Sequence, residues 1–169
     1  MADALPILYK SYKENAHLVE EIDLNSDTGT ACFFGVFLRG RLDWPALVIA
    51  MRYLPSGYGF EPGALVIPET QVLFLGAGTT LLAYDLSGPS RLWIDTADFG
   101  LLRWQRHGDV VVMSAELEMK AFDLRGKKLW SRFVEPPWYY KVDEGVIRLN
   151  VMGSESTVSL LTGDERTSY

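Results

Sequence analysis

Cysteine and histidine are almost missing from this sequence, which contains one cysteine and two histidines. Cys32 has no partner for an intrachain disulfide, and no multi-cysteine metal site can form. His17 and His107 cannot supply three zinc ligands without distant carboxylates, so we expect no metal. Cys32 lies within the apolar stretch ACFFGVFL, where a thiol is expected to be buried and inert.

The sequence also lacks an excess of basic residues and any long apolar run. It has 16 Lys and Arg against 22 Asp and Glu, so we do not expect the basic surface that nucleic-acid binding requires. The longest apolar stretches end at Arg39 and Arg52, well short of the ~20 residues of a membrane span. The N-terminus has no basic region followed by a long apolar core. We therefore expect a cytoplasmic protein without membrane contact.

The remaining composition is that of a globular protein. Hydrophobic residues make up 48% and charged residues 22% of the 169 residues, which predicts a single domain over 1–169. Its N-terminal part, 1–60, contains a segment, Tyr9–Ile22, that fits a short helix or an arm. A hairpin is predicted from two apolar stretches on either side of the charged turn Arg41–Leu42–Asp43. A loop rich in Pro and Gly precedes residues 64–163.

An internal repeat organises residues 64–163. The stretch AYDLSG at 83–88 recurs as AFDLRG at 121–126, and this offset of 38 residues is close to the length of a propeller blade. Under the same offset VLFLGAG aligns with VVVMSAE, and RLWID aligns with KLWSR after a slip of one residue. A weaker third copy ends at Gly163 and is not followed by its Trp strand. Each full unit is predicted to contain four strands, with a Gly turn before the last.

The repeated positions resemble blades of β-propellers of the quinoprotein-dehydrogenase-like and WD-repeat types. The matching residues are Ala83, Tyr84, Asp85, Leu86, Gly88, Leu92 and Trp93 in one unit, and Ala121, Phe122, Asp123, Leu124, Gly126, Leu129 and Trp130 in the next. The resemblance implies a mainly β fold, an antiparallel meander of blade-like units too few to close a ring. A small β-sandwich is the alternative. Exposed edge strands could also join copies of the chain as a homo-oligomer. EPPW with a later VMG resembles a group of small bacterial proteins, which implies no activity.

The stretch VLFLGAGTTLLAYDL, residues 72–86, poses the question of a nucleotide-binding loop. Gly76 and Gly78 fit a dinucleotide fingerprint, but its third glycine position is occupied by Leu81. Asp85 follows Gly78 after only seven residues, whereas the ribose-binding acid of such loops follows after about 20. The repeat aligns Gly78 with Glu116, whose carboxylate would repel phosphate. We therefore predict a hairpin turn and no cofactor.

The repeated acids and glycines are interpreted as structural. Asp side chains accept backbone N–H bonds in turns. We therefore predict that Asp85 and Gly88 fix the turn of the first unit, and that Asp123 and Gly126 fix the equivalent turn of the second. No Gly-x-Ser-x-Gly elbow is present. We predict no catalytic residue and expect that the protein is not an enzyme.

The best candidate for binding is EPPWYY, residues 135–140. Consecutive side chains on a strand point to opposite faces, so Trp138 and Tyr140 are expected to share one face and Tyr139 to take the other. Glu135, Trp138, Tyr139 and Tyr140 are therefore the predicted binding residues, where an aromatic side chain stacks on a ligand or anchors a partner. The alternative is that Trp138 and Tyr140 fill the core.

Three functions remain open. The first is a non-catalytic protein-interaction module of unknown partner, of which an inhibitor or immunity protein is one form. The second is a small-molecule or saccharide binder that uses aromatic stacking together with carboxylates such as Glu135 and Asp98. The third, a carboxylate-based hydrolase, is disfavoured because Glu116 and Glu118 are interpreted as a solvated pair on one strand face.

Overall fold

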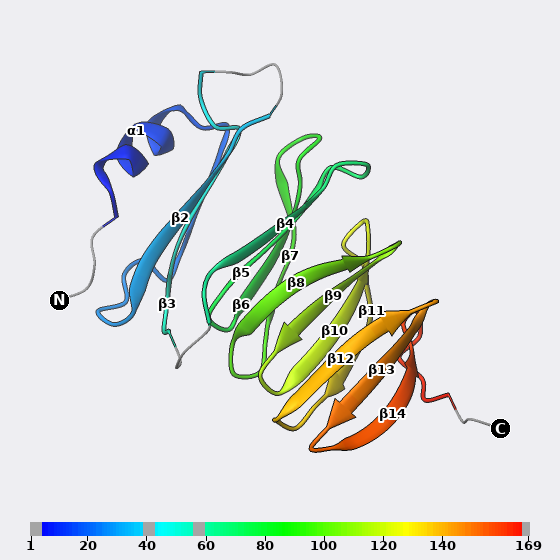
Figure 1. Ribbon diagram of the computed structural model, residues 1–169. Helices are drawn as coiled ribbons and strands as arrows, with labels where there is room; N and C mark the ends of the chain where they lie inside the picture. The colour runs from blue at the N-terminus through cyan, green and yellow to red at the C-terminus, as the bar shows by residue number, and fades with distance from the viewer. Residues whose placement is uncertain (1–4, 39–42, 56–59, 167–169) are drawn as a thin grey trace.

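The computed structural model describes residues 5–38, 43–55 and 60–166. Within these residues there are one short helix and four sheets, and the sheets follow one another along the chain (Figure 1). The predicted class is confirmed: the fold is mainly β and made of blade-like units that do not close a ring. Four sheets are present in place of two, so the sandwich alternative is wrong.

The N-terminal part forms a helix and a three-stranded sheet. The elements are α1 (Ile7–Asn15), β1 (Leu18–Ile22), β2 (Thr30–Val36) and β3 (Leu47–Tyr53), in the sheet order β1-β3-β2. β2 and β3 form the predicted antiparallel hairpin, whose predicted turn residues Arg41 and Leu42 lie outside the described residues. The segment predicted as a helix or an arm is both α1 and a strand, because β1 pairs parallel with β3.

Three blade-like sheets follow, here called blades 1, 2 and 3. Blade 1 contains β4 (Gly63–Ile67), β5 (Val72–Ala77), β6 (Thr80–Asp85) and β7 (Ser90–Thr96). Blade 2 contains β8 (Leu101–His107), β9 (Val110–Ala115), β10 (Glu118–Asp123) and β11 (Lys128–Phe133). Blade 3 contains β12 (Trp138–Asp143), β13 (Val146–Val151) and β14 (Ser154–Ser159). Neighbouring strands within each blade are antiparallel.

Blades 1 and 2 agree with the predicted repeat down to a local irregularity. A register shift separates Ala83 from Tyr84 against β7, and a shift at the equivalent place separates Ala121 from Phe122 against β11. The question of a nucleotide loop is also answered, because β5 and β6 are antiparallel strands joined by a tight turn. Gly78 in that turn has φ +57°, a conformation that glycine adopts at little cost.

The described residues after β14 turn back and bridge to it, a contact that the repeat alignment did not reveal. Glu165 forms an antiparallel bridge with Val158, at the position where Lys128 pairs with Phe122 in blade 2. The Arg166 N–H also donates to the Thr157 carbonyl at 2.8 Å. The last described residues therefore cover part of the β14 edge.

Apolar side chains fill the space between each pair of neighbouring sheets. Leu47, Ile49 and Met51 of β3 pack on Leu75 and Leu82 of blade 1. Phe74 packs on Trp104 and Phe122, with ring centroids 5.2 and 5.7 Å away, and joins blade 1 to blade 2. A third cluster joins blade 2 to blade 3. Cys32 belongs to the first cluster but is only partly buried, and its burial raises the pKa of the thiol to about 11.

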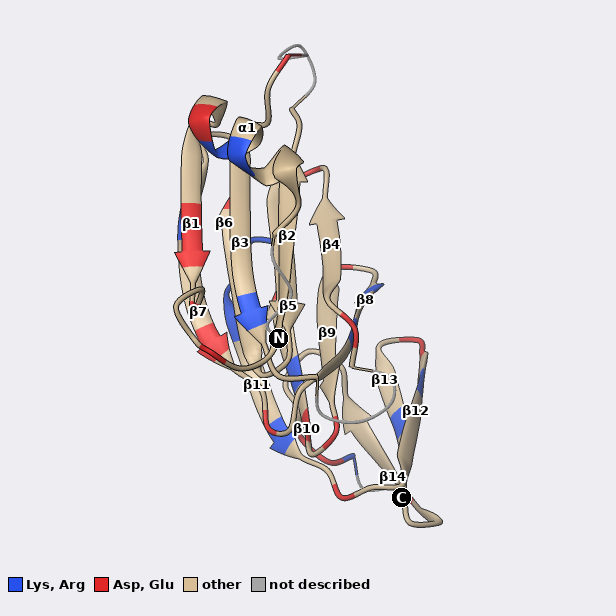
Figure 2. Ribbon diagram, turned by 90° about the vertical axis from the view of Figure 1, so that its left-hand side faces the viewer, with Lys and Arg blue, Asp and Glu red and all other residues tan. Residues whose placement is uncertain are grey.

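The two outer faces of the stack are covered in different ways. α1 lies on the face of the N-terminal sheet turned away from blade 1, where Tyr9 and Tyr12 pack near Phe33. Figure 2 shows β1 at the edge of this sheet, with an acidic segment; there Glu21 accepts hydrogen bonds from the Tyr9 hydroxyl and the Lys13 ammonium. The outer face of blade 3 is polar, with paired positions Lys141–Arg148, Arg148–Thr157 and Asn150–Glu155.

Candidate functional site

The predicted turn acids accept backbone hydrogen bonds. Asp85 Oδ1 accepts from the Ser87 N–H at 2.8 Å and from the Ser87 hydroxyl at 2.6 Å. Asp123 Oδ1 accepts from the N–H groups of Arg125 and Lys127, both at 2.9 Å. These are the contacts that a turn-fixing role requires, and their contribution to stability stays a prediction.

The two predicted turn glycines differ in conformation. Gly126 has φ +86°, whereas Gly88 has no positive φ, and a Cβ on Gly88 would meet no atom within 4 Å. The reason lies in the next residue: Pro89 follows Gly88 and favours an extended conformation there, whereas Lys127 follows Gly126. Gly88 is therefore a position that tolerates a side chain.

The repeated Trp of each full blade contacts the Gly turn of the next blade. The Trp93 indole donates to the Gly126 carbonyl at 2.6 Å, and the Trp130 indole donates to the Leu160 carbonyl at 2.9 Å. A Cβ on Gly163 would lie 2.7 Å from Trp130 Cγ. The spacing of Trp and Gly in the repeat is thus the pattern of an interface between blades.

The structure separates the four predicted binding residues. Trp138 and Tyr140 stack with centroids 6.2 Å apart and pack toward blade 2, as the core alternative supposed, while Tyr139 is exposed on the other face. The Trp138 indole donates to the Glu116 carbonyl at 2.8 Å, and the Tyr140 hydroxyl donates to Gln105 Oε1 at 2.9 Å. Glu135 is exposed in the connection between β11 and β12. A recognition role for this set stays a prediction.

One end of the stack is acidic. The connecting segments at this end, here called the acidic end, are 23–29, 54–55, 60–62, 78–79, 97–100, 116–117, 134–137 and 152–153. They carry Asp23, Asp27, Glu61, Asp98, Glu116 and Glu135, and no Lys or Arg. The connections at the opposite end, by contrast, contain Arg125 and Lys127 as well as acids. Because Glu135 belongs to the acidic end, the predicted binding segment begins there.

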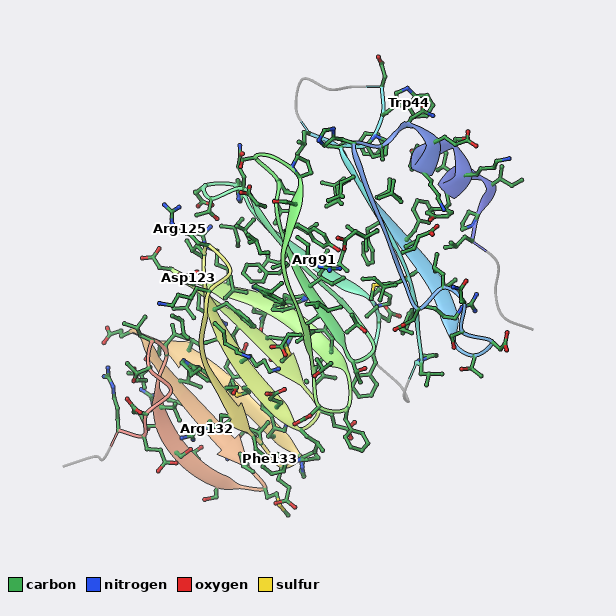
Figure 3. All side chains as sticks on the ribbon, turned by 180° about the vertical axis from the view of Figure 1, so that it is seen from behind. Trp44, Arg91, Asp123, Arg125, Arg132 and Phe133 are labelled. Atoms are coloured by element: carbon green, nitrogen blue, oxygen red, sulfur yellow. The ribbon has the colours of Figure 1, made fainter. Side chains whose placement is uncertain are left out.

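Among the described residues, four of the most exposed apolar side chains gather at the acidic end. They are Leu54 (65% exposed), Phe99 (62%), Phe133 (65%) and Met152 (63%). Figure 3 shows Phe133 at the tip of blade 2, at the opposite end of the sheet from Asp123 and Arg125. Sequence reasoning did not find these residues, because turns that are distant in sequence bring them to one end.

Two of these four residues have an unfavourable backbone conformation. Phe99 has φ +65° and Met152 has φ +51°, a region that Gly and Asn occupy more readily than large apolar residues. Both are followed by glycine in a turn. The Phe99 loop is also anchored, because the N–H groups of Ala97 and Leu101 donate to the carbonyls of Thr79 and Gly78, both at 2.7 Å. The fold thus holds exposed apolar side chains in place at some conformational cost.

A cleft of about 1020 Å³ opens at this end between the N-terminal sheet and blade 1. Asp23, Arg52, Tyr53, Asp98 and Phe99 are among the residues that line it. A second and smaller hollow, of about 470 Å³, lies at the opposite end between blades 2 and 3 and includes His107 and Asp109.

A buried ionic network joins blades 1 and 2. Lys120 Nζ donates to the Thr96 carbonyl at 2.6 Å and lies 3.2 Å from Asp95 Oδ2 and 3.3 Å from Glu118 Oε2. Glu118 is therefore not solvated, and the interpretation of Glu116 and Glu118 as a solvated pair on one strand is wrong, since Glu116 lies in the turn before β10.

The carboxyl groups with shifted pKa values are all shifted downward. For Asp95, burial raises the pKa, but the N–H of Thr96 and the ammonium groups of Lys128 and Lys120 outweigh this and lower it. The pKa values of Glu21, Glu69 and Asp85 are also lowered, each chiefly by a side-chain hydrogen bond. A general acid needs the opposite shift. Among the described residues no group of three or more His, Cys, Asp or Glu could hold a metal ion.

The sheet topology defines the class of this protein as a mainly β chain of propeller-type blades. No protein-family model and no curated protein matches it. Solved structures that resemble it include the computationally designed Ika4 protein, at 16% identity and TM-score 0.49 over 68% of this chain and 75% of that one. BamB from Moraxella catarrhalis matches at 16% identity and TM-score 0.44, over 63% of this chain and 36% of BamB. A europium-containing methanol dehydrogenase matches at 14% identity and TM-score 0.43, over 68% of this chain and 26% of the enzyme.

Within the described part of the chain, no helix is long and apolar enough to span a membrane.

Proposed function

We propose that this protein is a non-catalytic protein-interaction module that binds its partner at the acidic end. The observation that carries the proposal is the pair Phe99 and Met152. Both are large, apolar and mostly exposed, and both occupy a backbone conformation that favours Gly or Asn. Both leave most of their apolar surface open to contact with another molecule, which supports binding at this end.

The charge of the acidic end indicates the kind of partner. Six carboxylates without a basic residue in the connecting segments favour a basic protein surface and disfavour nucleic acid. We place this interaction in the cytoplasm, away from membranes. The single cysteine of the chain is in keeping with that compartment.

A saccharide or other small ligand is the second candidate. Its support is the cleft, which combines the aromatic rings of Tyr53 and Phe99 with the carboxylate of Asp98. A carboxylate hydrolase is not favoured, because the shifted carboxyl groups are held in the ionised form.

Site-specific photocrosslinking in the source cells tests the proposal. The photoreactive residue p-benzoylphenylalanine replaces Phe99 in one variant and Leu161 in another, since Leu161 is equally exposed at the opposite end. If the partner binds at the acidic end, we expect one crosslinked protein from position 99 and none from position 161. Equal crosslinking from both positions, or crosslinking from neither, contradicts it.

Titration of the purified partner then separates contact from folding. Phe99→Asn and Met152→Asn are expected to weaken binding about tenfold or more while melting no lower than the parent, since Asn tolerates positive φ. Leu161→Asn is the control and should bind like the parent. Unchanged affinity in both test variants overturns the assignment to the acidic end. A glycan array that identifies a neutral saccharide as the ligand overturns the module in favour of the second candidate.

A further inference from the structure

The cleft between the N-terminal sheet and blade 1 is built from both sides. Asp23 follows β1 and Tyr53 ends β3, while Asp98 and Phe99 lie in the connection between β7 and β8. At about 1020 Å³ the cleft is large enough for a segment of polypeptide and not only for one small group.

The free charge in this cleft is negative. No hydrogen bond or ion pair involves the carboxylates of Asp23 and Asp98 within the described part of the chain. The cleft also contains Glu21, which is engaged by the Tyr9 hydroxyl and the Lys13 ammonium of α1. Among the described residues of the lining, the cation is Arg52, which donates to the neutral Gly29 carbonyl at 3.1 Å and so offsets at most one of the two negative charges of Asp23 and Asp98. A cationic group entering the cleft therefore finds two unpaired carboxylates.

The walls of the cleft suit the apolar and π surface of such a group. Tyr53 and Phe99 contribute aromatic rings, and Leu54 contributes an exposed aliphatic side chain. Arg and Lys combine a long aliphatic stem with a cationic head that is attracted to aromatic faces and carboxylates. A neutral ligand would leave the charge of Asp23 and Asp98 unmatched.

We propose that the cleft receives an Arg or Lys side chain on a segment of the partner protein. This inference rests on the proposed function and names the chemistry that the partner brings to it. The positions of the two acids are defined by the fold: Asp23 stands at φ +53° in the turn that follows β1, and the Asp98 carbonyl accepts the Leu117 N–H at 3.5 Å.

The test uses two peptides of known sequence on the full-length, isotope-labelled protein. One is the heptapeptide Gly-Leu-Arg-Trp-Arg-Leu-Gly with blocked ends, and the other replaces both arginines by citrulline, which is uncharged and nearly the same shape. The basic peptide is expected to shift the NMR amide signals of residues 23, 53, 98 and 99. Its affinity is expected to fall as NaCl rises from about 0.05 to about 0.5 M.

Matched charge changes locate the site. Asp23→Asn and Asp98→Asn are isosteric, and each is expected to lower the affinity for the basic peptide by roughly threefold. Asp109→Asn removes the same charge from the hollow at the opposite end and should have no effect. Unchanged melting temperatures show that the variants remain folded.

The outcomes separate this inference from the proposed function. Equal binding of the citrulline peptide, shifts outside the cleft, or no binding of either peptide overturns the basic side chain as occupant. If crosslinking from position 99 still captures a partner in that case, the interaction module stands and only the inference fails. If that crosslinking fails as well, both fail.

Discussion

One carboxylate oxygen of Asp123 organises the turn between β10 and β11, since it accepts two backbone N–H groups at 2.9 Å. Asp85 has the same position in blade 1 and accepts from the backbone and hydroxyl of Ser87. We predict that Asp85→Ala and Asp123→Ala each lower the free energy of unfolding by about 1–2 kcal/mol. Urea unfolding measures this, with Asp109→Ala as a control.

These turn residues are remote from the acidic end, so partner binding should persist in both variants once they are folded. Unfolding curves that coincide with that of the parent would show that the hydrogen bonds contribute nothing and that the structural assignment of both acids is wrong.

The sequence predicts the turn acids better than it predicts the exposed apolar residues of the acidic end. Asp123 was predictable because it recurs as Asp85 at a fixed offset. Phe99 and Met152 do not recur, and they were missed. A signal for them does exist: each is a large apolar residue directly before a glycine in a turn, where Asn or Asp is usual.

At the scale of elements, each full blade is joined to the next through a Trp that lies against a glycine turn. Gly163 has φ +75°, and its Cβ position is 2.7 Å from Trp130 Cγ. Gly163→Ala is therefore expected to cost both backbone strain and a clash, about 2–4 kcal/mol together. Thermal melts and urea unfolding measure the loss.

Gly108→Ala is the matched control for this prediction, because Gly108 has φ +60° but no atom within 4 Å of its Cβ position. It should lose only the strain component, about 1 kcal/mol. Equal losses in the two variants would contradict a packing role for the interface between Trp130 and Gly163.

The network around Lys120 makes the junction of blades 1 and 2 sensitive to acid. The pKa of Asp95 is lower in the folded state than its ordinary value of 3.8, so its contribution to stability is complete well above pH 3.8 and is lost as the pH falls through the folded pKa. We predict that Asp95→Asn lowers the free energy of unfolding by about 2 kcal/mol at pH 7, and that this difference shrinks at acidic pH.

Urea unfolding of parent and variant from pH 7 down to acidic pH measures the difference. Asp143→Asn is the control, since its ion pair with Arg148 is long and exposed and should contribute little at any pH. A difference between parent and Asp95→Asn that stays constant with pH would show that the Asp95 carboxylate is not favoured by folding.

Most of the strands were predictable from the sequence, but the contacts between strands distant in sequence were not. The alternation of apolar strands and the repeat offset predicted the hairpin and the blades. The parallel strand β1 was missed, because its Glu20 and Glu21 give it the polarity of a surface helix. Its partners explain this composition: Glu20 accepts from Tyr84 at 2.6 Å and from Arg91 at 3.0 Å in blade 1. Such contacts between distant segments leave no pattern in a single sequence.

At the scale of the whole molecule, an open row of blades has two outer faces that would otherwise expose its interior. Repeat arrays generally end in units with a polar outer face. The outer face of blade 3 is polar, with Lys141, Arg148 and Glu155, and α1 covers the outer face of the N-terminal sheet. We therefore expect a monomer in solution, measured by light scattering on a sizing column. The alternative is a homo-oligomer through edge strands.

A change in the cover of the N-terminal sheet tests this account. In α1, Tyr9 and Tyr12 contact Phe33 of β2, with ring centroids 5.7 and 6.2 Å away, and shield Val48 and Ala50. The double variant Tyr9→Ser, Tyr12→Ser should weaken the packing of α1 on the sheet and expose this apolar face. We expect it to self-associate increasingly as its concentration rises. Ile7→Ser changes a residue of the same helix that is 91% exposed and should leave the mass unchanged. A parent protein that is already dimeric, with the double variant dimeric to the same extent, would show that edge strands and not the outer faces control association.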